Sequence, residues 1–241
     1  MAEPTEPNVR VTFETFLDGW LVRQQTFLEQ LRSSLSAPSD NVTKVEEQHR
    51  HLIGQVLSHY QQYYEEKGKA AAQDVILLFS PPWLSSLERT MLWIAGFKPS
   101  LVFRLVDISG PRVDLSADQA ERMERVRVDT RREERELTEA MARLQENMAA
   151  PPLLDLARRV GRLVNGEVTS VLDSVMGALK MSMLMLLESA DALRGNTVRK
   201  VVDILSPAQT VRLLAAAAQF QLQLRRSGLE KDSQRGTTNL A

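Results

Sequence analysis

The sequence predicts an all-α fold, a single multi-helix bundle with several long helices. Apolar residues recur every three or four positions over most of the 241 residues, which is the period of an amphipathic helix. Residues that start and stop helices flank these stretches. The most strand-like run, residues 75–79, lies between helical patterns, so no sheet is expected.

Three helices are expected in the N-terminal third of the chain. The first covers residues 12–35 and has Thr12 as its N-cap. The second covers about residues 40–67, and Gly68 is expected to cap its C-terminus. A shorter apolar helix, residues 70–79, ends at a Ser-Pro-Pro sequence, because proline cannot continue a helix.

Capping boxes, in which a serine precedes Glu or Gln by three residues, mark further helix starts. These pairs are Ser85 with Glu88, Ser116 with Gln119 and Ser206 with Gln209. The first box predicts a helix from residue 85 to Gly96, and a short apolar helix, residues 101–106, follows it. The second box predicts a long helix that reaches Met148.

The C-terminal part predicts one long helix and two shorter ones. The long pattern covers about residues 153–194, either as one helix or with an interruption near Gly161 or Asn165-Gly166. It is expected to break at Gly195-Asn196, before a short helix at residues 197–205. The last helix begins at Pro207 and ends near residue 226, with Gly228 as its cap. The expected organisation is a flexible N-terminus (1–11), one helical domain (12–228) and a flexible C-terminal tail (229–241).

The composition excludes several kinds of chemistry. The chain contains no cysteine, which rules out disulfides, thiolate metal sites and a cysteine nucleophile. Its 30 basic and 31 acidic residues nearly cancel, so it lacks the positive excess of a nucleic-acid-binding chain. No nucleophile elbow, phosphate-binding loop or dinucleotide fingerprint occurs. We therefore expect neither an enzyme nor direct nucleic-acid contact.

The apolar stretches are too short to span a membrane. The longest, residues 181–187, is about a third of the length that a spanning helix needs. The N-terminus lacks the apolar region of a secretory signal, so we expect a soluble protein of the nucleus or cytoplasm. The same apolar helix carries Met176, Met181, Met183 and Met185, which indicate either a core helix or an adaptable partner surface.

All three histidines, His49, His51 and His59, lie on one expected helix. His51 and His59 are eight residues apart, which is too far for the i, i+4 chelation of zinc-binding helices. The three histidines are therefore candidates for haem ligation at most, and no metal site is expected.

Two stretches carry a specific pattern. The first contains Phe13, Phe16, Trp20, Leu21, Gln24, Leu28 and Leu31 at helical spacing. The second contains Glu88, Arg89, Leu92 and the run Trp93-Ile94-Ala95-Gly96-Phe97-Lys98-Pro99-Ser100, and between the two lie Ser58-His59-Tyr60, Lys67-Gly68 and Ala72-x-Asp74-Val75. This pattern resembles the Delay of Germination domain of plants, which also follows the basic zipper in TGA transcription factors. The resemblance covers about residues 12–226, and beyond Leu115 it rests mainly on the helical pattern.

The resemblance implies a regulatory protein of seed dormancy and abscisic-acid signalling that contacts type 2C protein phosphatases through its N-terminal helix. The corresponding partner-binding candidates are Phe13, Phe16, Asp18, Trp20, Leu21 and Gln24. The aromatic residues among them form one stripe, which is either core or a partner groove. The family signature residues, expected mostly to define the fold, are Glu88, Arg89, Trp93, Gly96, Phe97, Pro99 and Ser100.

Two alternative functions stay open. In TGA factors the domain serves dimerisation and co-regulator docking. One alternative is therefore a transcription co-factor that pairs with a basic-zipper factor, and the chain could equally form a homodimer. The expected domain start at residue 12 leaves no room for a basic region, which favours the stand-alone branch of the family. The other alternative is a sensor that binds haem or a lipid in an apolar helical cavity. Haem binding in that branch is associated with histidines in the C-terminal half, and none follows His59 here, so no cofactor is expected.

Overall fold

The computed structural model describes residues 8–36, 41–108, 115–149 and 166–238, and these residues form eight helices and no strand. The helices are α1 (Val9–Ser36), α2 (Val42–Gln73), α3 (Val75–Phe79), α4 (Ser86–Thr90), α5 (Leu101–Ile108), α6 (Ala117–Ala149), α8 (Gly166–Ile204) and α9 (Pro207–Thr238). The predicted all-α class is confirmed.

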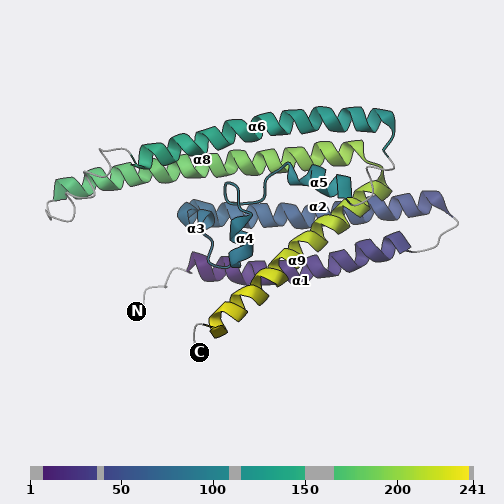
Figure 1. Ribbon diagram of the computed structural model, residues 1–241, viewed down its shortest axis with the longest axis horizontal. Helices are drawn as coiled ribbons and strands as arrows, with labels where there is room; N and C mark the ends of the chain where they lie inside the picture. Colours follow the sequence, from purple (N-terminus) through teal and green to yellow (C-terminus); the bar gives the residue numbers. More distant parts are fainter. Residues whose placement is uncertain (1–7, 37–40, 109–114, 150–165, 239–241) are drawn as a thin grey trace, which may run out of the picture.

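The long helices form two layers (Figure 1). In one layer α1 and α2 run antiparallel, and α9 crosses them diagonally. In the other layer α6 and α8 form an antiparallel pair. The short helices α3, α4 and α5 lie near α2, within the span of the long helices, and the start of α1 and the end of α9 lie on the same side of the molecule.

Apolar side chains from several helices meet between α1, α2 and α9. Leu31, Val56 and Val211, one from each helix, are almost completely buried in one cluster. A second cluster joins Val106 of α5 to Val201 of α8. Each such side chain contributes roughly 1.5–3 kcal/mol through removal from water. The first cluster stabilises the layer of α1, α2 and α9, and the second, which also contains residues of α6 and α9, connects the two layers.

The predicted helix end at Gly68 is wrong, because α2 continues to residue 73. A glycine inside a helix lowers its stability by only about 1 kcal/mol, and the burial of Ala70 and Ala71 just after it offsets that loss. The true boundary is Asp74, whose carboxylate accepts hydrogen bonds from the backbone N–H groups of Ile76 and Leu77. Asp74 therefore caps α3.

The capping boxes at Ser85, Ser116 and Ser206 form as predicted. The helix after the first box nevertheless ends at Thr90 and does not reach residue 96. Ile94 and Ala95 adopt φ angles of 45° and 55°, in the left-handed region that no right-handed helix contains. The chain leaves the helix early, and the turn that follows binds the side chain of Arg194 through its backbone oxygens.

The predicted break at Gly195-Asn196 is also wrong, because α8 runs without interruption to Ile204. Leu193 and Thr197, on either side of the glycine, are both buried. Packing along this face keeps the helix continuous in spite of a residue pair that usually ends helices. Residues 153–165 of the predicted helix lie outside the described residues.

The last helix, α9, continues to Thr238, so the predicted end near Arg226 is wrong. Gly228 lies inside the helix, and a Cβ atom built on it would lie 2.1 Å from Ser85 Oγ. Its lack of a side chain therefore allows α9 to approach the start of α4. Residues 229–238 are helical, and residues 239–241 lie outside the described residues.

Candidate functional site

The six partner-binding candidates on α1 do not share one face. Phe13, Trp20 and Gln24 are at most 3% exposed and belong to the core. Asp18 is exposed, with 77% of its side-chain surface open to solvent. The remaining two, Phe16 and Leu21, are half-buried.

Trp20 and Gln24 bind to neighbouring helices inside the molecule. Trp20 Nε1 donates to the backbone oxygen of His59 at 2.9 Å, which ties α1 to α2. Gln24 Nε2 donates to Tyr60 Oη at 2.6 Å and to Gln221 Oε1 at 3.1 Å, which adds α9. The aromatic stripe is therefore core in this structure, and of the six candidates Asp18 is the one that is freely accessible.

The outward face of α1 carries two apolar residues that the sequence reasoning did not select. Val11 and Val22 are 57% and 69% exposed. They lie seven residues before and four residues after Asp18, so all three project from one side of the helix. We call Val11, Asp18 and Val22 the α1 outer face. The sequence could have indicated this, because both valines lie outside the apolar stripe that predicts the buried face of the helix.

The signature residues 93–100, which we call the signature loop, enclose the side chain of Arg194 on α8. Arg194 donates to the backbone oxygens of Trp93, Ile94 and Phe97, the last at 2.7 Å. A Cβ atom on Gly96 would lie 2.8 Å from Arg194 Cζ. The loop thus needs glycine at that position in order to close around the guanidinium group.

A buried ionic group continues this network towards α2. Asp191 pairs with Arg194 and also accepts from Lys67 Nζ at 2.8 and 2.9 Å. Lys67 is only 1% exposed, and burial lowers its pKa to about 8, although Asp191 acts in the opposite direction. Lys67, Asp191 and Arg194 therefore join α2, α8 and the signature loop through one shared set of hydrogen bonds.

The rest of the signature loop is held by α6 and α9. The backbone N–H of Ser100 donates to Glu134 Oε1 at 2.6 Å, and Trp93 Nε1 donates to Thr138 Oγ1 at 3.0 Å. The ring of Phe97 meets Phe220 edge to face, with centroids 5.9 Å apart. Pro99 is also buried. Because the loop contacts both α6 and α9, which belong to different layers, it acts as a structural junction between the two layers.

The two signature residues on α4 have different surroundings. Glu88 is buried and closes the capping box, and Arg225 Nη1 of α9 lies 3.6 Å from its carboxylate. Arg89 is exposed. Beside them, Asp232 accepts from the backbone N–H and the hydroxyl of Ser86, which lowers the pKa of Asp232. These bonds fasten α4 to α9.

The three histidines lie in three different environments. His49 is buried near the backbone oxygen of Ser34, His51 is exposed, and His59 is buried between α1 and α2. No cluster of three His, Cys, Asp or Glu suited to a metal ion occurs among the residues that the structure describes.

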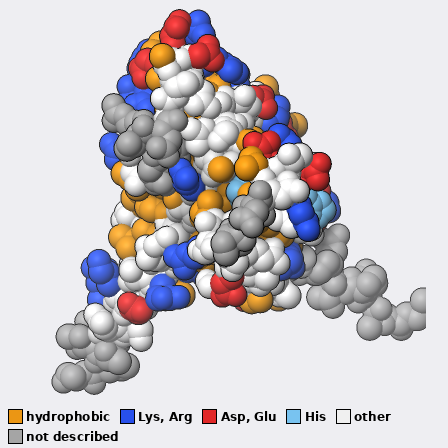
Figure 2. Space-filling model, turned by 90° about the vertical axis from the view of Figure 1, so that its right-hand side faces the viewer, with side chains coloured by type: hydrophobic (Ala, Val, Ile, Leu, Met, Phe, Trp, Pro, Cys, Tyr) orange, Lys and Arg blue, Asp and Glu red, His pale blue; other side chains and the backbone are white. Residues whose placement is uncertain are grey.

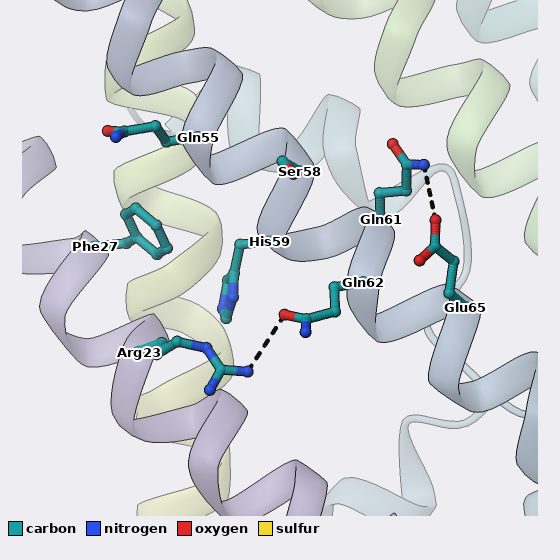
Figure 3. Close-up of a pocket in the computed structure, with 8 residues that line it drawn as sticks. All are labelled: Arg23, Phe27, Gln55, Ser58, His59, Gln61, Gln62 and Glu65. Carbon is teal, nitrogen blue, oxygen red and sulfur yellow. Dashed lines mark hydrogen bonds between the residues drawn. The ribbon is translucent and has the colours of Figure 1, made fainter.

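His59 lies in a pocket of about 470 Å³ on the surface between α1 and α2 (Figure 3). The lining residues are Arg23, Phe27, Gln55, Ser58, His59, Gln61, Gln62 and Glu65. Most of these are polar, whereas a haem macrocycle requires an apolar slot. The residues do not fit a haem site.

Surface charge is mixed on the face shown in Figure 2, where basic and acidic side chains are interspersed among apolar ones. On α6, arginines pair with acidic residues one turn away, as Arg125 does with Glu121 at 3.3 Å and Arg122 with Asp118 at 3.6 Å. Such pairs cancel the field that phosphate binding would need. In the part of the chain that the structure describes, no helix has the length and apolar character to cross a membrane.

Comparison with known proteins gives consistent matches. The family described as "Seed dormancy control" (DOG1) matches residues 27–107. Protein ZW2 of Arabidopsis thaliana is 43% identical, over 90% of this chain and 96% of that protein. Protein RESPONSE TO ABA AND SALT 1 of the same plant is 42% identical, over 89% of this chain and 94% of that protein. Transcription factor TGA2.3 of rice is 27% identical, over 90% of this chain and 64% of that protein.

Proposed function

The chain belongs to the seed dormancy control (DOG1) family, and we propose that it is a non-catalytic regulator that works by docking protein partners. Its relatives carry names of abscisic-acid response and transcription, which supports a role in dormancy or hormone signalling. The buried ionic groups Lys67, Glu134 and Arg194 each bind other parts of the fold, which supports a structural and non-catalytic role for them.

The α1 outer face is the observation that carries the docking proposal. Val11 and Val22 leave apolar surface in water, and Asp18 places a carboxylate between them. Its ion-pair contact with Arg225 is long, at 3.9 Å. A partner that covers the valines and supplies a cation to Asp18 would bury apolar area and form a charged hydrogen bond. We propose that a type 2C protein phosphatase binds here.

The test is a binding measurement between the full chain and purified type 2C phosphatases. Val22→Arg and Asp18→Lys should each weaken binding by at least about tenfold, because each opposes one of the two contacts. Val128→Arg on α6 is the matched control, since Val128 is also exposed (56%) but lies on another helix. Equal binding by all variants, with circular dichroism showing intact helices, would refute docking at this face.

We also propose that the chain acts in the nucleus, alone or with a basic-zipper factor. Its relation to TGA2.3 favours this location. A fluorescent fusion in plant cells should accumulate in nuclei. In an electrophoretic mobility-shift assay, the purified chain should further retard DNA that is bound by a basic-zipper factor and should not retard the same DNA in the absence of that factor. Exclusion of the fusion from nuclei would refute the proposal.

A further inference from the structure

The pocket between α1 and α2 has the size of a small-molecule site. Its volume, about 470 Å³, falls within the usual range of ligand pockets. Arg23 and Phe27 enter it from α1, and the other lining residues come from α2 (Figure 3). This pocket has no part in the docking face proposed above.

The imidazole of His59 is fixed in place but incompletely bonded. Its ring stacks on Trp20 with centroids 4.4 Å apart and an interplanar angle of 6°, and Phe27 lies 5.1 Å away. These contacts hold the ring between two aromatic side chains. His59 Nε2 is buried, yet it has no hydrogen-bond partner among the described residues. A buried polar atom without a partner is unfavourable and calls for a specific explanation.

Arg23 lines the same pocket as His59 and has unused hydrogen-bonding capacity (Figure 3). Its guanidinium group bridges from α1 to Gln62 Oε1 on α2 through one long bond of 3.4 Å. Its positive charge is one cause of the lowered pKa of His59, after burial, which keeps the imidazole neutral near pH 7. A guanidinium group has five donors, so an incoming anion could replace the weak bond to Gln62 with stronger ones.

The acidic residue of the pocket does not oppose an anion at this end. Glu65 accepts from Gln61 Nε2 at 2.9 Å, and both side chains point away from His59 (Figure 3). The end near His59 therefore holds one cation, one neutral imidazole and the apolar ring of Phe27. A single guanidinium group matches the charge and the two oxygens of a carboxylate better than a phosphate dianion.

We propose that this pocket binds a small organic carboxylate. The Arg23 side chain turns away from Gln62 to pair with the carboxylate, and this movement uncovers His59 Nε2, which in its Nε2–H tautomer donates a hydrogen bond to the same carboxylate. The apolar body of the ligand lies against Phe27.

The test is an NMR titration of the full chain with cyclohexanecarboxylate, using cyclohexanecarboxamide as the neutral match. The acid should produce saturable shifts of the His59 ring signals, and the amide should bind at least about tenfold more weakly. Arg23→Gln should weaken binding of the acid by a similar factor and leave the amide unchanged. Arg32→Gln is the control, because Arg32 is exposed on the same helix outside the pocket, and it should behave as wild type.

Two results would overturn the proposal. One is the absence of any saturable shift at His59 with the carboxylate, which would mean that no carboxylate reaches this nitrogen. The other is equal affinity for acid and amide, or an unchanged affinity in Arg23→Gln, which would show that charge recognition by Arg23 has no role. Both readouts are independent of phosphatase binding, so they do not depend on the docking proposal.

Discussion

Replacement of Arg194 by alanine should be among the most destabilising changes in the protein. The side chain is 5% exposed, and it donates to three backbone oxygens of the signature loop and to Asp191. Removing one partner from a buried ion pair costs about 3–5 kcal/mol. Each buried oxygen left without a donor adds up to about 1–3 kcal/mol, although water entering the space recovers part of this. We expect a net loss of about 3–5 kcal/mol, out of a typical total of about 5–15 kcal/mol.

Urea unfolding followed by circular dichroism measures this loss directly. Arg199→Ala is the matched control, because Arg199 lies on the same helix but is exposed, and it should change stability by less than about 0.5 kcal/mol. A loss below about 1 kcal/mol for Arg194→Ala would refute the claim that this residue organises the signature loop.

Three further changes follow from the same structure. Trp20→Ala should lower the free energy of unfolding by about 3–5 kcal/mol, because it empties a core position; a folded variant of normal stability would contradict this. Gly228→Ala should destabilise the protein by about 1–3 kcal/mol, because the added methyl group collides with Ser85. Gly54→Ala is the control, since nothing lies within 4 Å of the added methyl group, and it should stabilise by up to about 1 kcal/mol. Thermal melts that rank the two variants the other way would refute the close approach of α9 to Ser85. The pKa of Lys67 is lowered from 10.5 to about 8, so the unfolded chain binds more protons between these values, and the stability that Lys67 contributes should rise with pH from about 8 to 10. Urea titrations of wild type and Lys67→Met across that range should show the rise in wild type only, and parallel curves would contradict it.

The fold class could be predicted from local sequence signals, whereas the long-range contacts could not. Periodicity and the capping boxes at Ser85, Ser116 and Ser206 depend on residues within one or two turns, so they can be read from the sequence. Arg194 binds a loop 97 to 101 residues away, and nothing in its neighbourhood along the chain marks that role. Gly228 resembles an ordinary helix cap, although its function is to let another helix approach.

The candidate docking site was predicted at the level of the helix and less well at the level of the residue. The sequence placed the aromatic stripe on the first helix but left open whether Trp20 is core or groove. Burial of Trp20 assigns it to the core, and the exposed residues Val11 and Val22 were not selected because a lone apolar residue at the surface is common. Only the packing of α2 and α9 against α1 distinguishes the two faces.

The most direct test of the account is methyl cross-saturation NMR of the chain in complex with a type 2C phosphatase. Saturation of the phosphatase should transfer to the methyl groups of Val11 and Val22 on the α1 outer face and should spare Val56, which is 1% exposed. Transfer to methyl groups elsewhere on the surface, with none at Val11 or Val22, would contradict the proposal that this face docks the partner.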